Sequence, residues 1–119
     1  MSVAVIDRND VVLRGRLAAP PEYRELPSGD VLVSFRLNVR RSEQRAGRRI
    51  TDSLQCVSFD RSLQRRIGAW ATNDLVEVEG ALQRRFWRTS HGVDSITEVN
   101  CRRGRKVTRA TSAHEVGVG

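Results

Sequence analysis

An apolar residue at every second position limits the folds that are open to this chain. Between residues 31 and 40, every second residue is apolar. A period of two places all of these side chains on one face of a β-strand and leaves the other face to solvent or a ligand. The apolar positions are Val31, Val33, Phe35, Leu37 and Val39. The pattern therefore predicts a strand with one buried face.

The same period recurs in other segments, although less regularly after residue 50. Residues that favour turns separate these segments, because Pro, Gly, Asn and Asp readily adopt the dihedral angles of a chain reversal. We expect turns at residues 27–30, 73–74 and 90–92. The strands expected from this reading cover about residues 11–17, 31–40, 50–59, 76–88 and 93–101.

One short helix is expected between the third and fourth of these strands. Asp60 can cap its N-terminus by accepting a backbone hydrogen bond. Leu63, Ile67 and Trp70 follow at i, i+4 and i+7, so they share one face and are expected in the core. Five strands with a helix at this place predict an all-β protein. The fold class is the OB-fold, a five-stranded Greek-key barrel with one short helix between strands 3 and 4.

The length of the chain fits one such barrel. Its 119 residues, of which 39% are hydrophobic, leave room for one domain. We expect this domain at residues 1–103, followed by a short, flexible, basic and polar tail at residues 104–119.

No run of 18 apolar residues and no signal peptide is found, so we expect no membrane association. Two cysteines, Cys56 and Cys101, favour reduced thiols in the cytoplasm and no metal or cofactor.

The charge of the chain indicates a polyanionic partner. There are 21 basic against 14 acidic residues, and all of the basic residues except Lys106 are arginines. A guanidinium contacts phosphate through two parallel hydrogen bonds and stacks on bases, so a small Arg-rich domain is typical of nucleic-acid binding. A ribosome-like or merely Arg-biased protein would have the same composition.

Several arginines are candidates for contacts with phosphates. Residues 40–49 hold five arginines against a lone Glu43, and we expect them to form a flexible cationic hairpin loop. A solvated loop without a ligand is the alternative. Arg61, Arg65 and Arg66 are expected only to solubilise the helix, and the basic residues at 102–106 to act at most as a loose tether. The candidates are Arg14, Arg16, Arg36, Arg40, Arg41, Arg45, Arg48, Arg49, Arg84, Arg85 and Arg88.

Trp87 is a candidate for stacking on unpaired bases. It stands among arginines, and strand alternation puts Phe86 and Trp87 on opposite faces, so one of the two rings is expected to point outward. Single strands require cations along the backbone and flat rings for the bases. A position in the core or at a subunit contact is the alternative for Trp87.

Six segments together resemble the family of bacterial single-stranded DNA-binding proteins. The resemblance runs from about residue 9 to residue 101 and keeps the order and approximate spacing of the family. It implies an OB-fold that binds single-stranded DNA without sequence preference in DNA replication, recombination and repair, as a homo-oligomer, with a tetramer expected and a dimer as the alternative. Primosomal protein N is a dimeric relative with the same fold. The segments are residues 9–17, 21–29, 33–37, 76–82, 84–87 and 97–99.

The chain departs from the family in its aromatic residues and its C-terminus. Trp87 and Phe59 match two aromatic platforms of the family, while Glu43 and Ser53 stand where the family often has Trp. For Phe59, the alternative to stacking on a base is a position in the core. The resemblance therefore implies a weaker and more salt-dependent binder. The acidic tail that recruits partner enzymes is not matched after Lys106, so we expect no partner enzymes to be recruited through residues 104–119.

An enzyme is not expected. His91 and His114 lack an evident catalytic partner, and no motif of a nucleotide-binding loop or nucleophile is present. Three alternatives to single-stranded DNA binding stay open. They are an OB-fold module for protein interaction, a primosomal protein N-like dimer with weak DNA binding, and a binder of single-stranded RNA.

Overall fold

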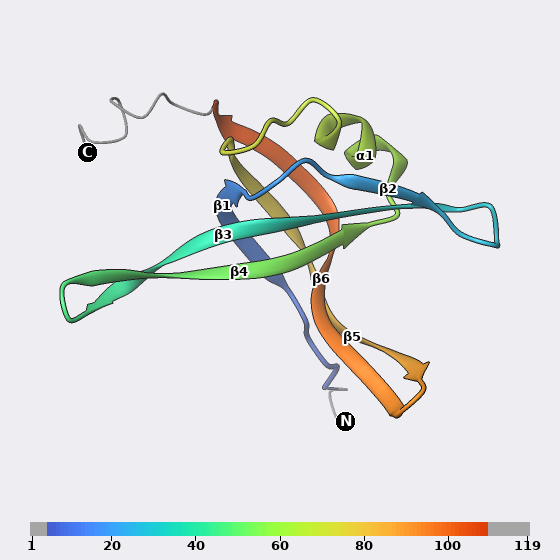
Figure 1. The fold of residues 1–119 in the computed structure, drawn as a ribbon. Helices are drawn as coiled ribbons and strands as arrows, with labels where there is room; N and C mark the ends of the chain where they lie inside the picture. The colour runs from blue at the N-terminus through green and yellow to red at the C-terminus, as the bar shows by residue number, and fades with distance from the viewer. Residues whose placement is uncertain (1–4, 110–119) are drawn as a thin grey trace, which may run out of the picture.

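The fold was obtained as a computed structural model, which describes residues 5–109 and, within them, not the side chains of residues 43–45. Six strands and one helix make up this part of the chain (Figure 1). The elements are β1 (Val11–Leu17), β2 (Glu22–Glu25), β3 (Val31–Arg45), β4 (Arg48–Ser58), α1 (Arg61–Ile67), β5 (Leu75–Thr89) and β6 (Gly92–Thr108).

Five of the strands close into a barrel in the order β1-β5-β6-β4-β3. The ring closes where the end of β1 pairs with β3, at Arg16↔Asn38 and Leu17↔Leu37. β4 and β6 run parallel at their contact, and the other pairings are antiparallel. The short strand β2 pairs with β3 alone, outside the ring. The predicted OB-fold barrel is thereby confirmed.

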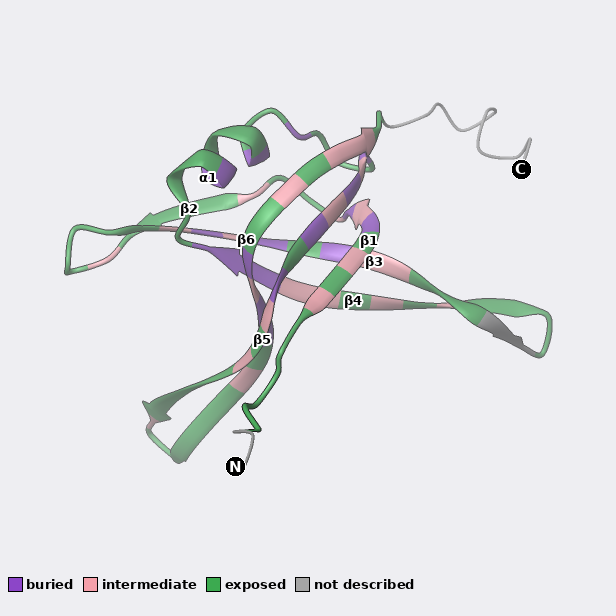
Figure 2. Ribbon diagram, turned by 180° about the vertical axis from the view of Figure 1, so that it is seen from behind, coloured by how far each residue is buried: buried purple, intermediate pink, exposed green. Residues whose placement is uncertain are grey.

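The core fills the barrel and continues beneath α1. The apolar faces that the alternation predicts are buried, with Leu17 and Leu37 fully inaccessible. Asp60 Oδ1 accepts a hydrogen bond from Leu63 N at 2.8 Å and caps α1, as expected. Trp70 is buried with its ring edge-on to Phe35 at 5.9 Å, which confirms its core position. Figure 2 shows the buried residues concentrated in the barrel and under α1.

The expected place of the helix between strands 3 and 4 was wrong, since α1 lies between β4 and β5. The difference arises from β2, which shifts the strand count by one. β2 is only four residues long, and all four are exposed, so it has no alternation to detect. The tight turn expected at residues 27–30 links β2 to β3, with Gly29 at φ +91°.

The expected flexible loop at residues 40–49 was also wrong. β3 and β4 continue through it to a two-residue turn at Ala46–Gly47, where both residues have positive φ. Backbone pairing does not require apolar side chains, so the loss of the alternation did not end the strands. β6 likewise extends past Cys101 to Thr108. Residues 104–108 of the expected tail are thus in a strand paired with β5, while residues 110–119 lie outside the described part.

Gly80 lies where β5 and β6 shift register, and a side chain has no room there. A Cβ at this position would overlap the backbone carbonyl oxygen of Asn100. We expect Gly80→Ala to lower the free energy of unfolding by about 1–3 kcal/mol, because backbone rather than a flexible side chain must move. Chemical denaturation measures this, with the exposed neighbour Glu79→Ala as the control. Equal denaturation midpoints for the two variants would contradict the close approach.

Candidate nucleic-acid interface

Two long hairpins extend from the barrel in different directions (Figure 1). We call residues 40–51 the β3–β4 arm and residues 83–98 the β5–β6 arm. Most of their residues are exposed (Figure 2). Nine of the thirteen predicted site residues lie on the arms, and Arg36 lies at the base of the β3–β4 arm. The nine are Arg40, Arg41, Arg45, Arg48 and Arg49 on one arm and Arg84, Arg85, Trp87 and Arg88 on the other.

The β3–β4 arm presents cations without acidic partners. Arg40, Arg48 and Arg49 are exposed and form no ion pair with any carboxylate in the described part of the chain. Arg41 differs, because Nε and Nη2 donate to the two carboxylate oxygens of Asp52 at 2.9 and 3.0 Å. These hydrogen bonds lower the pKa of Asp52 below its ordinary value. The side chain of Arg45 is outside the described atoms.

Arg36 lies flat on the outer face of the barrel. Its guanidinium donates to Ser53 Oγ at 3.0 Å, to the Ser53 carbonyl at 3.1 Å and to Gln55 Oε1 at 3.1 Å. None of these acceptors is charged, so the cation keeps its attraction for a phosphate. The planar group occupies the position beside Ser53. A fixed guanidinium plane also offers a surface on which a base can stack.

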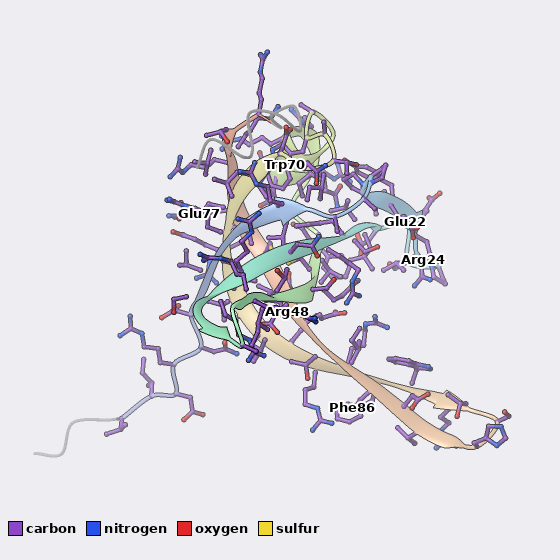
Figure 3. The ribbon with its side chains drawn as sticks, turned by 60° about the vertical axis from the view of Figure 1, so that its left-hand side comes forward. Glu22, Arg24, Arg48, Trp70, Glu77 and Phe86 are labelled. Atoms are coloured by element: carbon purple, nitrogen blue, oxygen red, sulfur yellow. The ribbon has the colours of Figure 1, made fainter. Side chains whose placement is uncertain are left out.

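The β5–β6 arm carries two exposed rings on opposite faces. Phe86 and Trp87 are 59% and 41% exposed, so both rings point outward rather than one. The arm extends beyond the barrel, and for this reason neither face is covered. Each ring lies under a cation: Arg84 is 5.1 Å from the Phe86 ring centroid and Arg85 is 5.3 Å from that of Trp87. Figure 3 shows Phe86 on this arm, far from Trp70 at the helical end.

A shallow hollow lies between β2, the outer face of β3 and β4, and the β5–β6 arm. Its volume is about 250 Å³, and its lining includes Arg85 from the β5–β6 arm and Gln55 from β4. Gln55 is the residue that also binds Arg36. Trp87 follows Arg85 by two residues and lies on the same face of β5. Ser34 lines the hollow, and Arg36 and Arg40 follow it on the same face of β3, so this face leads from the hollow toward the β3–β4 arm.

Phe59 lies at the far end of β4, in surroundings that the sequence did not indicate. It is 46% exposed and lines a second hollow of about 620 Å³ together with Tyr23, Arg61 and Arg65. The two arginines were expected only to solubilise α1, yet they flank an exposed ring. Tyr23 Oη donates to the Gln64 carbonyl at 2.8 Å, and partial burial raises the pKa of Tyr23. The signal in the sequence that could have indicated this hollow is Tyr23, the aromatic residue between Pro21 and Pro27.

Arg14 and Arg16 are not brought together with the arms. Arg14 pairs with Glu77 at 3.2 Å, and Glu77 also binds Arg105 at 2.9 Å. Figure 3 shows Glu77 well separated from Phe86. Arg16 donates to the carbonyl of Asn73 at 3.0 Å. The charge of Arg14 is thus offset by a carboxylate at a distance from the exposed rings.

Within residues 5–109, no group of three or more His, Cys, Asp or Glu residues is arranged to hold a metal ion. The described residues also include no helix that is long and apolar enough to cross a membrane. The candidate site therefore consists of the two arms and the outer face of β3 and β4.

The ion pair between Arg41 and Asp52 leads to a prediction. We expect Asp52→Asn to release Arg41 for a phosphate, raising the affinity for a single strand at low salt and steepening the slope of log K against log salt by about 0.7. Asp7→Asn is the control, because it changes the net charge equally at an exposed position outside the arms. Equal slopes for the two variants would show that Arg41 gains no phosphate contact.

A closed five-stranded barrel with a cationic outer face and exposed rings defines an OB-fold domain of the nucleic-acid-binding class. The comparisons with known proteins agree, since residues 8–109 match the model of the single-strand binding protein family. The chain belongs to this family.

Curated relatives support the family membership. Single-stranded DNA-binding protein 1 of Staphylococcus aureus (strain COL) is 39% identical over 95 residues, which are 78% of this chain and 57% of the relative. Single-stranded DNA-binding protein A of Bacillus subtilis (strain 168) is 34% identical over 85 residues, which are 71% of this chain and 49% of the relative. The chain thus spans about half the length of these relatives.

A solved structure supports the fold. The chain is similar to the structure titled "Plasmodium falciparum SSB complex with ssDNA", with a TM-score of 0.71 and 24% sequence identity. The similarity covers 86% of this chain and 95% of the other. At this identity the likeness establishes the OB-fold architecture and no more.

Proposed function

We propose that this chain binds single-stranded DNA without sequence preference, in DNA replication, recombination and repair. The observation that carries the proposal is the exposed indole of Trp87, with the Arg85 cation over its ring, on a protein whose β3–β4 arm exposes Arg40, Arg48 and Arg49. The names of the related bacterial proteins support the same function. The surface suits binding rather than catalysis, because rings and cations dominate it and it brings no nucleophile and base together.

The proposed mechanism is capture of the phosphate backbone followed by stacking of the bases. The arginines of the β3–β4 arm attract the strand and release its counterions. Arg36 on β3 and Arg85 at the hollow then hold phosphates, and an unpaired base lies on Trp87. No contact in this scheme reads a base edge, which is why the binding is proposed to tolerate any sequence.

The finer properties of the family are proposals for this chain. We propose a homo-oligomer, with a tetramer favoured over a dimer, located in the cytoplasm with the nucleoid. The family membership supports these properties. Phe59, Arg14, Arg16 and Arg45 stay among the proposed contact residues, although only Arg45 lies on an arm and the other three lie outside the two arms.

A titration with oligo-dT, followed by tryptophan fluorescence and read against the measured mass of the protein, tests the proposal. We expect saturable quenching, because a base stacked on Trp87 quenches its emission, and a stoichiometry that gives the site size per subunit. Oligo-U serves as the competitor. Equal or stronger binding of oligo-U would favour RNA as the ligand, and absence of binding to either would favour a module for protein interaction.

A further inference from the structure

Glu98 is a carboxylate on the outer face of β6 that is nevertheless buried. It is 2% exposed, although the strand positions around it alternate between the core and the outside. A buried charge is costly unless hydrogen bonds satisfy it. Gln83 Nε2 donates to Glu98 Oε2 at 2.7 Å, and Asn100 Nδ2 donates to Gln83 Oε1 at 3.2 Å. Side chains of β5 and β6 thus fix the carboxylate at the base of the β5–β6 arm.

The remaining contacts of Glu98 are with Arg85. Arg85 Nη2 donates to Glu98 Oε1 at 3.2 Å and Arg85 Nε donates to Glu98 Oε2 at 3.4 Å. Two hydrogen bonds to one carboxylate fix the orientation of the guanidinium plane as well as its position. The same guanidinium lies 5.3 Å from the centroid of the Trp87 ring. A chain of contacts therefore runs from the buried carboxylate through Arg85 to the exposed indole.

The opposite face of the arm provides an internal comparison. Arg84 lies over Phe86 at 5.1 Å, almost the same separation. Its guanidinium donates a hydrogen bond to Ser95 Oγ at 3.0 Å, an exposed hydroxyl and not a buried acid. The two ring–cation pairs thus differ in what holds the cation. Only the pair on the Trp87 face is anchored to the interior.

We propose that Glu98 is a positioning residue for base stacking: it holds Arg85 against one face of the Trp87 indole, so that the ring is already oriented when a base arrives on its other face. The proposal rests on the proposed function and deepens it. A ring that is fixed in advance loses less side-chain freedom on binding than a free one. Glu98 itself does not contact the strand, and its carboxylate would repel a phosphate if it were not covered by Arg85.

The test is a double-mutant cycle between Glu98→Gln and Trp87→Ala, read as affinity for oligo-dT. We expect Glu98→Gln alone to weaken binding by about 3- to 10-fold, in line with the ordering cost of one side chain. In the Trp87→Ala background we expect a loss below about 2-fold, since the ring to be positioned is gone. A general weakening of the barrel would give equal losses in both backgrounds and would overturn the proposal, as would no loss in either.

A second readout does not depend on DNA. The indole N–H resonance of Trp87, identified by its absence in Trp87→Ala, is expected to shift and sharpen in Glu98→Gln while that of Trp70 stays in place. Ser95→Ala is the matched control on the Phe86 face and is expected to leave the Trp87 resonance unchanged. An unmoved Trp87 resonance in Glu98→Gln would overturn the positioning role even if the protein bound no DNA.

Arg85→Lys is the second test variant, for the case that Glu98→Gln does not fold. Lysine keeps the positive charge but cannot bind the carboxylate with a planar fork. We expect it to reproduce the loss of affinity and the shift of the Trp87 resonance. If Arg85 served only as a phosphate contact, Lys would substitute with little loss, and the positioning role would be refuted. If wild-type protein bound no oligo-dT while the resonance shifted as expected, the proposed function would fail and the positioning would stand.

Discussion

Trp87→Ala is expected to weaken the binding of oligo-dT by about 5- to 150-fold, measured by fluorescence anisotropy of a labelled strand. Base–aromatic stacking in single-strand-binding OB-folds contributes about 1–3 kcal/mol per base, and this general range sets the expected loss. Trp87 is 41% exposed and projects from an arm rather than from the core. The melting temperature is therefore expected to stay close to that of the wild type.

Phe86→Ala is the matched control for this loss. Phe86 is the neighbouring ring on the same arm and also has an arginine over its ring, but strand alternation puts it on the face opposite to Arg85, which lines the hollow beside β3 and β4. We expect its removal to change the affinity by less than about 2-fold, because a ring off the path of the strand stacks on no base. A larger effect of Phe86→Ala than of Trp87→Ala would place the strand on the opposite face of the arm.

The second large effect is expected from salt. Six of the predicted site arginines on β3, β4 and β5 form no ion pair with a carboxylate in the described structure, so each keeps its charge for a phosphate. Neutralising about five phosphates gives a slope near −3.5 in log K against log salt, and raising salt from about 50 to 200 mM then weakens binding roughly 100-fold. The six are Arg36, Arg40, Arg48, Arg49, Arg84 and Arg88.

The combined variant Arg40→Gln/Arg48→Gln/Arg49→Gln locates this electrostatic contribution. Removing three phosphate contacts is expected to make the slope shallower by about 2. The triple variant Arg61→Gln/Arg65→Gln/Arg66→Gln on α1 is the comparison with the same loss of charge, and we expect a smaller change from it. Tight binding that persists at high salt in the wild type would contradict a mainly electrostatic capture.

Much of the barrel could be predicted because its strands carry one buried face. The alternation at residues 11–17 and 31–39 gave β1 and the first part of β3, and the spacing of Leu63, Ile67 and Trp70 gave the buried face of α1. β2 could not be found in this way, since none of its residues is buried. The sequence predicts a loop where the β3–β4 arm lies. Strands that extend beyond the barrel are held by backbone pairing, so their sequence carries no hydrophobic pattern.

The sequence identified the residues of the candidate site, but it did not identify the carboxylates with which some of them form ion pairs. It singled out Trp87 and the arginines around it, but it did not distinguish free arginines from those bound to carboxylates. Arg14 and Arg85 bind Glu77 and Glu98, which are distant in sequence and adjacent only through the β1–β5 and β5–β6 pairings. Pairings of this kind depend on strand register, which local composition does not reveal.

The account depends on an unpaired strand crossing the face between the two arms, with a base on the outward side of the indole. Ultraviolet crosslinking of oligo-dT to the protein, followed by mass spectrometry of the linked peptides, tests this most directly. The account predicts crosslinks in the β5–β6 arm at Trp87, with further crosslinks in the peptides of β3 and β4. Crosslinks confined to β1 or to the Glu77–Arg105 side of the barrel, with none at Trp87, would contradict it.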